Sequence, residues 1–263
     1  MRALLATVAL TALLASTAAC AGQDDASAPA SGGPSAGTVS GSVTVLAAAS
    51  LTESFNRIGK DFEAANPGTK VTFSYGGSSG LAQQITSGAP ADVFAAASPA
   101  TMKTVTDAGD GAGTPVTFVK NQLVIAVPKG NPKGITSLSA LAKPGLKVAL
   151  CATQVPCGAA AQKALAAANV KLTPVTLEQD VKAALAKLKL GEVDAALVYR
   201  TDAKVASSDV DGVEFPESAQ AINDYPIVAL KNAPNAAGAA AFVRYVQSAP
   251  ALRVLTDAGF QQP

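Results

Sequence analysis

Two serines of this chain stand where a hydroxyl group and backbone amides could together bind an anion. Ser50 follows an apolar run at residues 43–49, which predicts a short strand, and it precedes a helical pattern. Ser78 repeats this arrangement, because it follows a predicted strand at residues 71–75 and two glycines, and precedes a predicted helix at 81–87. The apolar residues that recur at helical spacing after the first serine are Leu51, Phe55, Ile58 and Phe62.

The chemistry available at such a junction is hydrogen bonding to a negative charge. A serine at the start of a helix is a favoured N-cap, and the first amides of the helix have no carbonyl partner. Together with the positive end of the helix dipole, these amides form an anion site. The alternative is a capped helix that binds nothing. One junction alone favours that alternative, whereas two in the same chain favour an anion site.

The composition limits the possible partners. The chain has 263 residues, of which 49% are apolar and 15% charged, and this fits one or two α/β domains with a proper core. Its 20 basic and 19 acidic side chains give no reason to expect nucleic acid or a basic membrane-binding patch. An anion would therefore be held by local dipoles and hydrogen bonds.

The chain contains no histidine, which excludes Ser-His-Asp and Cys-His catalysis and any histidine-ligated metal site. Its 3 cysteines are too few and too scattered for a zinc site. A serine-dependent enzyme with a lysine base stays formally open, but Lys60 and Lys70 have no motif around them. We therefore expect a binding protein without a cofactor rather than an enzyme.

The N-terminal residues 1–19 predict a signal peptide, because Arg2 precedes an apolar run at 3–15 that is too short to span a bilayer. Small residues then precede Cys20, as in the lipobox of bacterial lipoproteins. Residues 20–40 are rich in Gly, Ser, Ala and Pro, which predicts a lipidated cysteine followed by a flexible linker. The alternative is an ordinary signal peptide cleaved near Ala19. We expect an extracytoplasmic, lipid-anchored protein whose folded part begins near Gly41.

Predicted strands and helices alternate along the rest of the chain, which favours an α/β fold with mixed or mostly parallel sheets. In such folds, ligands bind at the carboxyl ends of the strands. The remaining predicted strands are at residues 91–97, 123–127, 146–150, 175–177, 193–199 and 225–230. The predicted helices are at 52–65, 81–87, 99–108, 137–141, 159–168, 178–190, 236–247 and 250–258, with a short one starting at Asp202.

Six short motifs follow one another along the chain in a specific order. They are Ala-Ala-Ala-Ser-Leu at 47–51, Gly-Gly-Ser-Ser-Gly-Leu-Ala-Gln-Gln-Ile at 76–85, Gly-Ala-Pro-Ala-Asp-Val-Phe at 88–94, Gln-Val-Pro-Cys-Gly at 154–158, Gln-Asp-Val-Lys-Ala-Ala-Leu at 179–185 and Leu-Val-Tyr-Arg-Thr-Asp-Ala at 197–203. In this order they resemble the substrate-binding proteins of bacterial molybdate ABC transporters. The resemblance covers residues 41–260, and the order of the six is more specific than any one motif.

The resemblance implies a two-lobed clamshell of the periplasmic-binding-protein type (type II), in which each lobe is a central mixed sheet flanked by helices. Lobe 1 would comprise residues 41–124 and 227–263, and lobe 2 residues 125–226, with 123–127 and 225–230 as the crossing strands. It implies a monomer that captures molybdate or tungstate in the cleft and delivers it to a membrane ABC permease. A binding protein for another tetrahedral oxyanion, such as sulfate or phosphate, is the alternative.

The same resemblance implies five ligand-binding residues. Ser50 and Ser78 would each supply a hydroxyl and a backbone amide from lobe 1. Cys157 and Val181 would supply backbone amides, and Tyr199 its phenolic hydroxyl, from lobe 2. The family often has alanine at the position of Cys157, where only the amide is needed. Molybdenum would be bound only as its oxyanion, with no protein ligand on the metal.

The two remaining cysteines are expected to pair. With Cys20 assigned to lipid, Cys151 and Cys157 lie six residues apart in a compartment that permits disulfides. We predict a bond between them, with free thiols as the alternative, and expect it to hold the Cys157 amide in place for the ligand. Asp92, although part of a matching motif, is interpreted as a turn or cap carboxylate, because it would repel a bound dianion.

Overall fold

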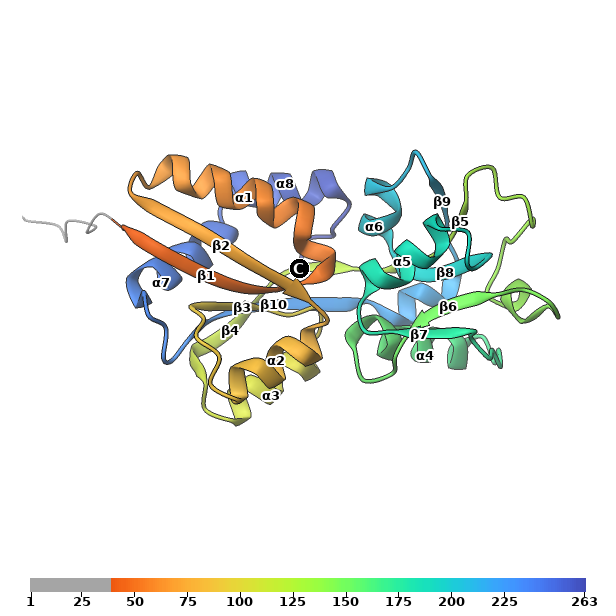
Figure 1. Cartoon of the computed structure of the whole chain (residues 1–263), viewed down its shortest axis with the longest axis horizontal. Helices are drawn as coiled ribbons and strands as arrows, with labels where there is room; N and C mark the ends of the chain where they lie inside the picture. The colour runs from red at the N-terminus through yellow and green to blue at the C-terminus, as the bar shows by residue number, and fades with distance from the viewer. Residues whose placement is uncertain (1–38) are drawn as a thin grey trace, which may run out of the picture. The chain divides into compact units, whose positions relative to one another are not determined.

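A computed structural model describes residues 39–263 of the chain, and within them two five-stranded mixed sheets each carry their own helices (Figure 1). The predicted signal peptide, Cys20 and nearly all of the predicted linker lie outside the described residues. Within the described residues, no helix is long and apolar enough to cross a membrane. The two sheets with their helices are the architecture that the sequence predicted.

The first sheet has the strand order β2-β1-β3-β10-β4. Strand β1 pairs in parallel with β2 and β3, whereas β10 pairs antiparallel with β3 and β4. β1 lies between two neighbours and is covered on both faces, which explains its nearly continuous apolar sequence. The strands are β1 Gly41–Ala48, β2 Thr69–Gly76, β3 Val93–Ala95, β4 Gly111–Asn121 and β10 Asn223–Leu230.

The helices around the first sheet bury the stripe predicted after the first serine, since Leu51, Phe55, Ile58 and Phe62 are all inaccessible to solvent. Phe62 meets Phe242 edge-to-face, with ring centroids 5.4 Å apart, which joins the first long helix to one near the C-terminus. The helices are the 3-10 turn η1 Ala49–Leu51, then α1 Thr52–Ala65, α2 Ser78–Thr86, α3 Pro99–Asp107, α7 Ala236–Val246 and α8 Ala249–Ala258.

The second sheet has the order β7-β6-β8-β5-β9 and a separate hydrophobic core. Here β6 pairs in parallel with β7 and β8, and β5 pairs antiparallel with β8 and β9. The strands are β5 Leu123–Pro128, β6 Val148–Cys151, β7 Thr176–Glu178, β8 Ala195–Tyr199 and β9 Val210–Val213. The helices are η2 Ser139–Ala142, α4 Pro156–Ala167, α5 Val181–Lys189, α6 Arg200–Val205 and η3 Pro216–Ala221.

The chain passes between the two sheets twice. The first passage is at Gln122, which separates β4 from β5, and the second is the segment 214–222, which leads from β9 to β10. The two strands expected to cross between the lobes therefore each pair within one sheet: β5 only in the second and β10 only in the first. Both passages lie side by side, because Asn223 pairs with Asn121.

Two strands were not predicted from the sequence. β4 is the outer strand of the first sheet, and its first half carries Gly113 and Pro115 and is largely exposed. β9 is the outer strand of the second sheet and contains Gly212. Outer strands need only partial burial and tolerate glycine and proline, so the alternating apolar pattern is weak in both.

Candidate functional site

A small pocket lies between the elements of the two sheets, and it contains all five residues proposed as ligand-binding. Its cavity volume is about 20 Å³. On the same measure one water molecule needs roughly 10–15 Å³, so the pocket is suited to a compact ligand. The first sheet and its helices contribute Ala48, Ala49, Ser50, Gly76, Gly77, Ser78 and Ala97 to the lining. The second contributes Val155, Pro156, Cys157, Asp180, Val181 and Tyr199.

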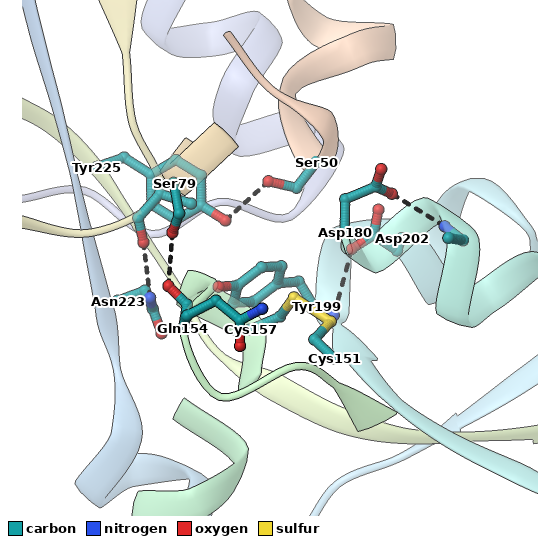
Figure 2. The surroundings of a disulfide bond; sticks show 12 residues. Ser50, Ser79, Cys151, Gln154, Cys157, Asp180, Tyr199, Asp202, Asn223 and Tyr225 are labelled. Carbon is teal, nitrogen blue, oxygen red and sulfur yellow. Dashed lines mark hydrogen bonds between the residues drawn. A yellow bond between two sulfur atoms is a disulfide. The ribbon is translucent and has the colours of Figure 1, made fainter. Parts of the chain in front are cut away.

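Ser50 lies in the 3-10 turn η1 between β1 and α1, and its side chain is buried. The expectation that Ser50 is an N-cap is wrong, because the turn is capped by Ala48 and α1 by Leu51, without a side-chain hydrogen bond. The Ser50 hydroxyl instead lies 2.9 Å from the hydroxyl of Tyr225 on β10 (Figure 2). The β1 strand thus delivers Ser50 to the pocket, and a residue distant in sequence contacts its oxygen.

Ser78 is the first residue of α2, one position inside the helix rather than at its N-cap, which is Gly77. Its Oγ accepts a hydrogen bond of 3.0 Å from the amide of Ala97, and its side chain is buried. The predicted capping role is therefore wrong for Ser78 as well. The physical reason is that the glycine before it already has the extended backbone of an N-cap, so the serine begins the helical turn.

Cys157 and Val181 bring helix starts of the second half to the same pocket. Cys157 is the second residue of α4 and Val181 the first of α5, so the amides of both belong to the first turn, which has no carbonyl partners within the helix. A disulfide bond joins Cys157 to Cys151 at the end of β6, with Cα atoms 5.7 Å apart. Behind it the loop is tightly packed: a Cβ on Gly158 would lie 2.0 Å from the carbonyl oxygen of Ala152.

Tyr199 ends β8 with its ring completely buried. Among the described residues its hydroxyl oxygen has no hydrogen-bond partner. Burial, followed by the nearby Tyr225 and Asp202, raises the pKa of Tyr199 well above its usual value, so the phenol keeps its proton. A buried donor without a partner that lines a pocket is suited to a ligand that supplies the acceptor.

Asp180 lines the pocket but was not proposed as a site residue. It is the N-cap of α5, and its Oδ1 accepts a hydrogen bond of 2.9 Å from the amide of Ala183 (Figure 2). The acidic residues before α5 were a visible signal of this cap in the sequence. Asp92 has the predicted structural role away from the pocket, since its carboxylate accepts from the amides of Thr44 at 2.7 Å and Asn235 at 2.6 Å.

Direct contacts surround the pocket and join the two halves. Ser79 on α2 donates to the carbonyl oxygen of Gln154 before α4 (Figure 2). On another side, Lys182 of α5 contacts both carboxylate oxygens of Glu53 on α1 at 2.8 Å. A ligand in the pocket would therefore be enclosed by residues from both sheets.

The arrangement is suited to binding an anion rather than to catalysis. The lining offers hydroxyl groups and the first amides of α2, α4 and α5, and it contains no lysine or arginine. Neither pocket serine contacts a base, because Ser50 pairs with a tyrosine hydroxyl and Ser78 accepts from an amide. A serine nucleophile needs an adjacent general base. In the described part of the chain, no group of acidic residues or cysteines could hold a metal ion.

Comparison with known proteins gives matches over nearly the whole chain. Residues 43–261 match the family described as bacterial extracellular solute-binding protein. The molybdate-binding protein ModA of Mycobacterium tuberculosis (strain H37Rv) is 44% identical over 251 residues, which cover 95% of each chain.

Two solved structures share the fold. The periplasmic molybdate-binding protein of Azotobacter vinelandii gives a TM-score of 0.73 at 20% identity, covering 84% of this chain and 99% of its own. The sulfate-binding protein SubI of Mycobacterium tuberculosis gives 0.72 at 20% identity, covering 84% and 86%. These likenesses confirm the predicted two-lobed type II clamshell.

Proposed function

Because this chain belongs to the family of bacterial extracellular solute-binding proteins, we propose that it captures molybdate, or tungstate, outside the cytoplasmic membrane for delivery to an ABC permease. Members of such a family bind a solute for transport and do not transform it. The identity of the solute is drawn from the curated relatives that are named as molybdate-binding, together with the chemistry of the pocket.

One observation carries the proposal: a small pocket whose hydrogen-bond donors are neutral and come from several helix starts. Helix N-termini favour negative charge, and their amides are free to donate. The buried, unpartnered hydroxyl of Tyr199 adds a donor from a different direction. A compact oxyanion with acceptors on all sides matches this set.

We assign the donors as follows. Ser50 and Ser78 each give a hydroxyl and an amide, Cys157 and Val181 give amides, and Tyr199 gives its hydroxyl. Charge-assisted hydrogen bonds contribute about 1.5–3 kcal/mol each. Five to seven of them, less the cost of ordering and closure, support a dissociation constant of about 1 μM or lower, near −8 kcal/mol. The disulfide beside Cys157 would limit that ordering cost by holding the α4 start in place.

The remaining parts of the proposal concern the organisation of the chain. Lobe 1, expected at residues 41–124 and 227–263, is assigned to the first sheet with its helices, and lobe 2, expected at 125–226, to the second sheet with its helices. All of β5 then belongs to lobe 2 and all of β10 to lobe 1. The protein is proposed to act as a monomer. Cys20 is proposed to carry the lipid that anchors the mature protein to the membrane. Mass spectrometry of membrane-extracted protein tests this directly: an unmodified Cys20, or soluble protein cleaved elsewhere, contradicts it.

The proposed ligand is tested by a thermal-unfolding panel with molybdate, tungstate, sulfate and phosphate. At about 100 times its dissociation constant, the correct ligand adds about 2.7 kcal/mol to the free energy of unfolding. The matched control is the Ser50→Ala, Ser78→Ala double variant, in which the shift should largely disappear. A larger shift with sulfate or phosphate than with molybdate contradicts the assignment, as does chemical conversion of the bound ligand.

A further inference from the structure

Behind Ser50, away from the pocket, lies a row of buried polar side chains. The hydroxyl of Tyr225 is 2.9 Å from Ser50 Oγ, and Asn121 Nδ2 lies 3.4 Å from the same tyrosine oxygen. Asn121 Nδ2 also donates to Thr201 Oγ1 at 2.9 Å. Tyr225, Asn121 and Thr201 are at most 2% exposed, and none of them lines the pocket. The three residues come from β10, β4 and α6.

The direction of the hydrogen bonds in this row is fixed at Asn121. The backbone amide of Gln122 donates to Asn121 Oδ1 at 2.9 Å, and an amide N–H can only donate. The carboxamide of Asn121 therefore turns its NH₂ group toward Tyr225 and Thr201. Its two protons serve one oxygen each, so the Tyr225 oxygen acts as an acceptor toward Asn121.

The orientation of Asn121 also determines which hydroxyl donates in the hydrogen bond between Tyr225 and Ser50. Ser50 Oγ and Asn121 Nδ2 are the only described side-chain atoms at hydrogen-bond distance from the Tyr225 hydroxyl. Because Asn121 Nδ2 can only donate, the buried phenolic proton has an acceptor only if it points to Ser50 Oγ. Burial raises the pKa of Tyr225, so this proton stays on the phenol. Ser50 Oγ accepts it, and its own proton must point elsewhere. The remaining open side of Ser50 is the pocket.

We propose that Tyr225, held in direction by Asn121, is a positioning residue that fixes the Ser50 hydroxyl as a hydrogen-bond donor to the ligand. This rests on the proposed function, because it needs an anion in the pocket. Ser78 has an equivalent arrangement made by the backbone, since the amide of Ala97 donates to Ser78 Oγ at 3.0 Å. Ser78 is therefore the internal control for a hydroxyl whose direction does not depend on Tyr225.

The test is a pair of double-variant cycles read by calorimetry with molybdate. Tyr225→Phe keeps the buried ring and removes the proton that Ser50 accepts, so the Ser50 hydroxyl is free to rotate. The dissociation constant should rise about 2- to 10-fold, the effect of one hydrogen bond. The same rise should appear in a Ser78→Ala background. In a Ser50→Ala background, Tyr225→Phe should change the dissociation constant by less than about 2-fold, because no hydroxyl is left to position.

If Tyr225 had only a structural role, Tyr225→Phe would weaken binding by the same factor in the Ser50→Ala and Ser78→Ala backgrounds, and that result overturns the proposal. An unchanged dissociation constant in Tyr225→Phe alone also overturns it. If Tyr225→Phe does not fold, Asn121→Ala, which leaves the tyrosine in place without its aligning donor, is taken through the same cycles. Failure of the proposed function is separate: the unaltered protein would then not bind molybdate at all, and both proposals would fall.

Discussion

Replacing Gly77 with alanine should keep the two halves of the protein from closing around the ligand. Gly77 is the N-cap of α2, with φ −63° and ψ 124°, a conformation that alanine adopts without strain. A Cβ added there would lie 2.1 Å from the carbonyl oxygen of Gln179. Gln179 belongs to the segment that leads into α5, so the new methyl group would collide with backbone from the other half.

The size of the effect follows from this distance. Real Cβ atoms do not approach other atoms closer than 3.0 Å, so the two segments must separate by about 1 Å. A hydrogen bond of about 2.9 Å that lengthens by this amount is lost. At least one donor from Cys157, Val181 or Tyr199 should then fail to reach the ligand. This costs about 1.5–3 kcal/mol and raises the dissociation constant roughly ten- to a hundredfold.

Calorimetry with molybdate measures the loss of affinity, and small-angle scattering with and without ligand measures closure. Without ligand the two lobes can separate, which relieves the collision. The free energy of unfolding of the variant should therefore be at least that of the original protein, because alanine restricts the unfolded chain more than glycine does. The matched control is Gly80→Ala in the same helix, where a Cβ meets no atom within 4 Å and binding should be unchanged. Full affinity and normal closure in Gly77→Ala would show that binding does not need this approach of the two halves.

Three other outcomes are expected. Ser50→Ala and Ser78→Ala should each raise the dissociation constant for molybdate, measured by calorimetry, roughly ten- to a hundredfold. Ser78→Ala should also lower the free energy of unfolding by about 1–3 kcal/mol, because the buried amide of Ala97 loses its acceptor. Tyr199→Phe removes a donor that reaches the ligand from the second lobe, so it should weaken binding and reduce the closed population that scattering detects with ligand present. Normal closure in this variant would show that Tyr199 does not help to close the lobes. Burial raises the pKa of Asp202 to about 6, above its ordinary 3.8, so the folded protein holds this proton more tightly than the unfolded chain. This difference contributes about 3 kcal/mol to the free energy of unfolding below about pH 4, and the contribution is lost as the pH rises through about 6. In urea titrations between these pH values, the free energy of unfolding of Asp202→Asn should not show this fall.

Local sequence patterns predicted that Ser50 and Ser78 would lie at the site, whereas Cys157, Val181 and Tyr199 came from the family resemblance. A strand, small residues and a helix start are adjacent in the chain, so Ser50 and Ser78 could be recognised as lying at strand ends. Their exact hydrogen bonds could not be predicted, since each depends on a distant residue. The oxygen of Ser50 contacts Tyr225, which is 175 residues away in sequence. The Ser78 oxygen binds an amide of a neighbouring segment, and that bond replaces the expected cap.

The fold was predictable to a similar degree. Helix α1 has a regular apolar stripe and was expected with the bounds it has, at 52–65. Strand β4 was missed because only its second half packs into the core, at Phe118 and Val119, after a start that contains glycine and proline. Its pairing with β10 joins residues about 100 positions apart, such as Asn121 and Asn223, and tertiary packing rather than local preference decides it.

The absence of basic side chains from the pocket lining bears on how fast the protein takes up its ligand in solutions of different ionic strength. No lysine or arginine is among the residues that line it, and the chain carries almost equal numbers of basic and acidic groups. The attraction of dipoles and hydrogen-bond donors acts only near the pocket entrance, so little of it is screened by dissolved ions. Association should therefore gain little from electrostatic steering, but it should also proceed at nearly the same rate in dilute and in salty surroundings.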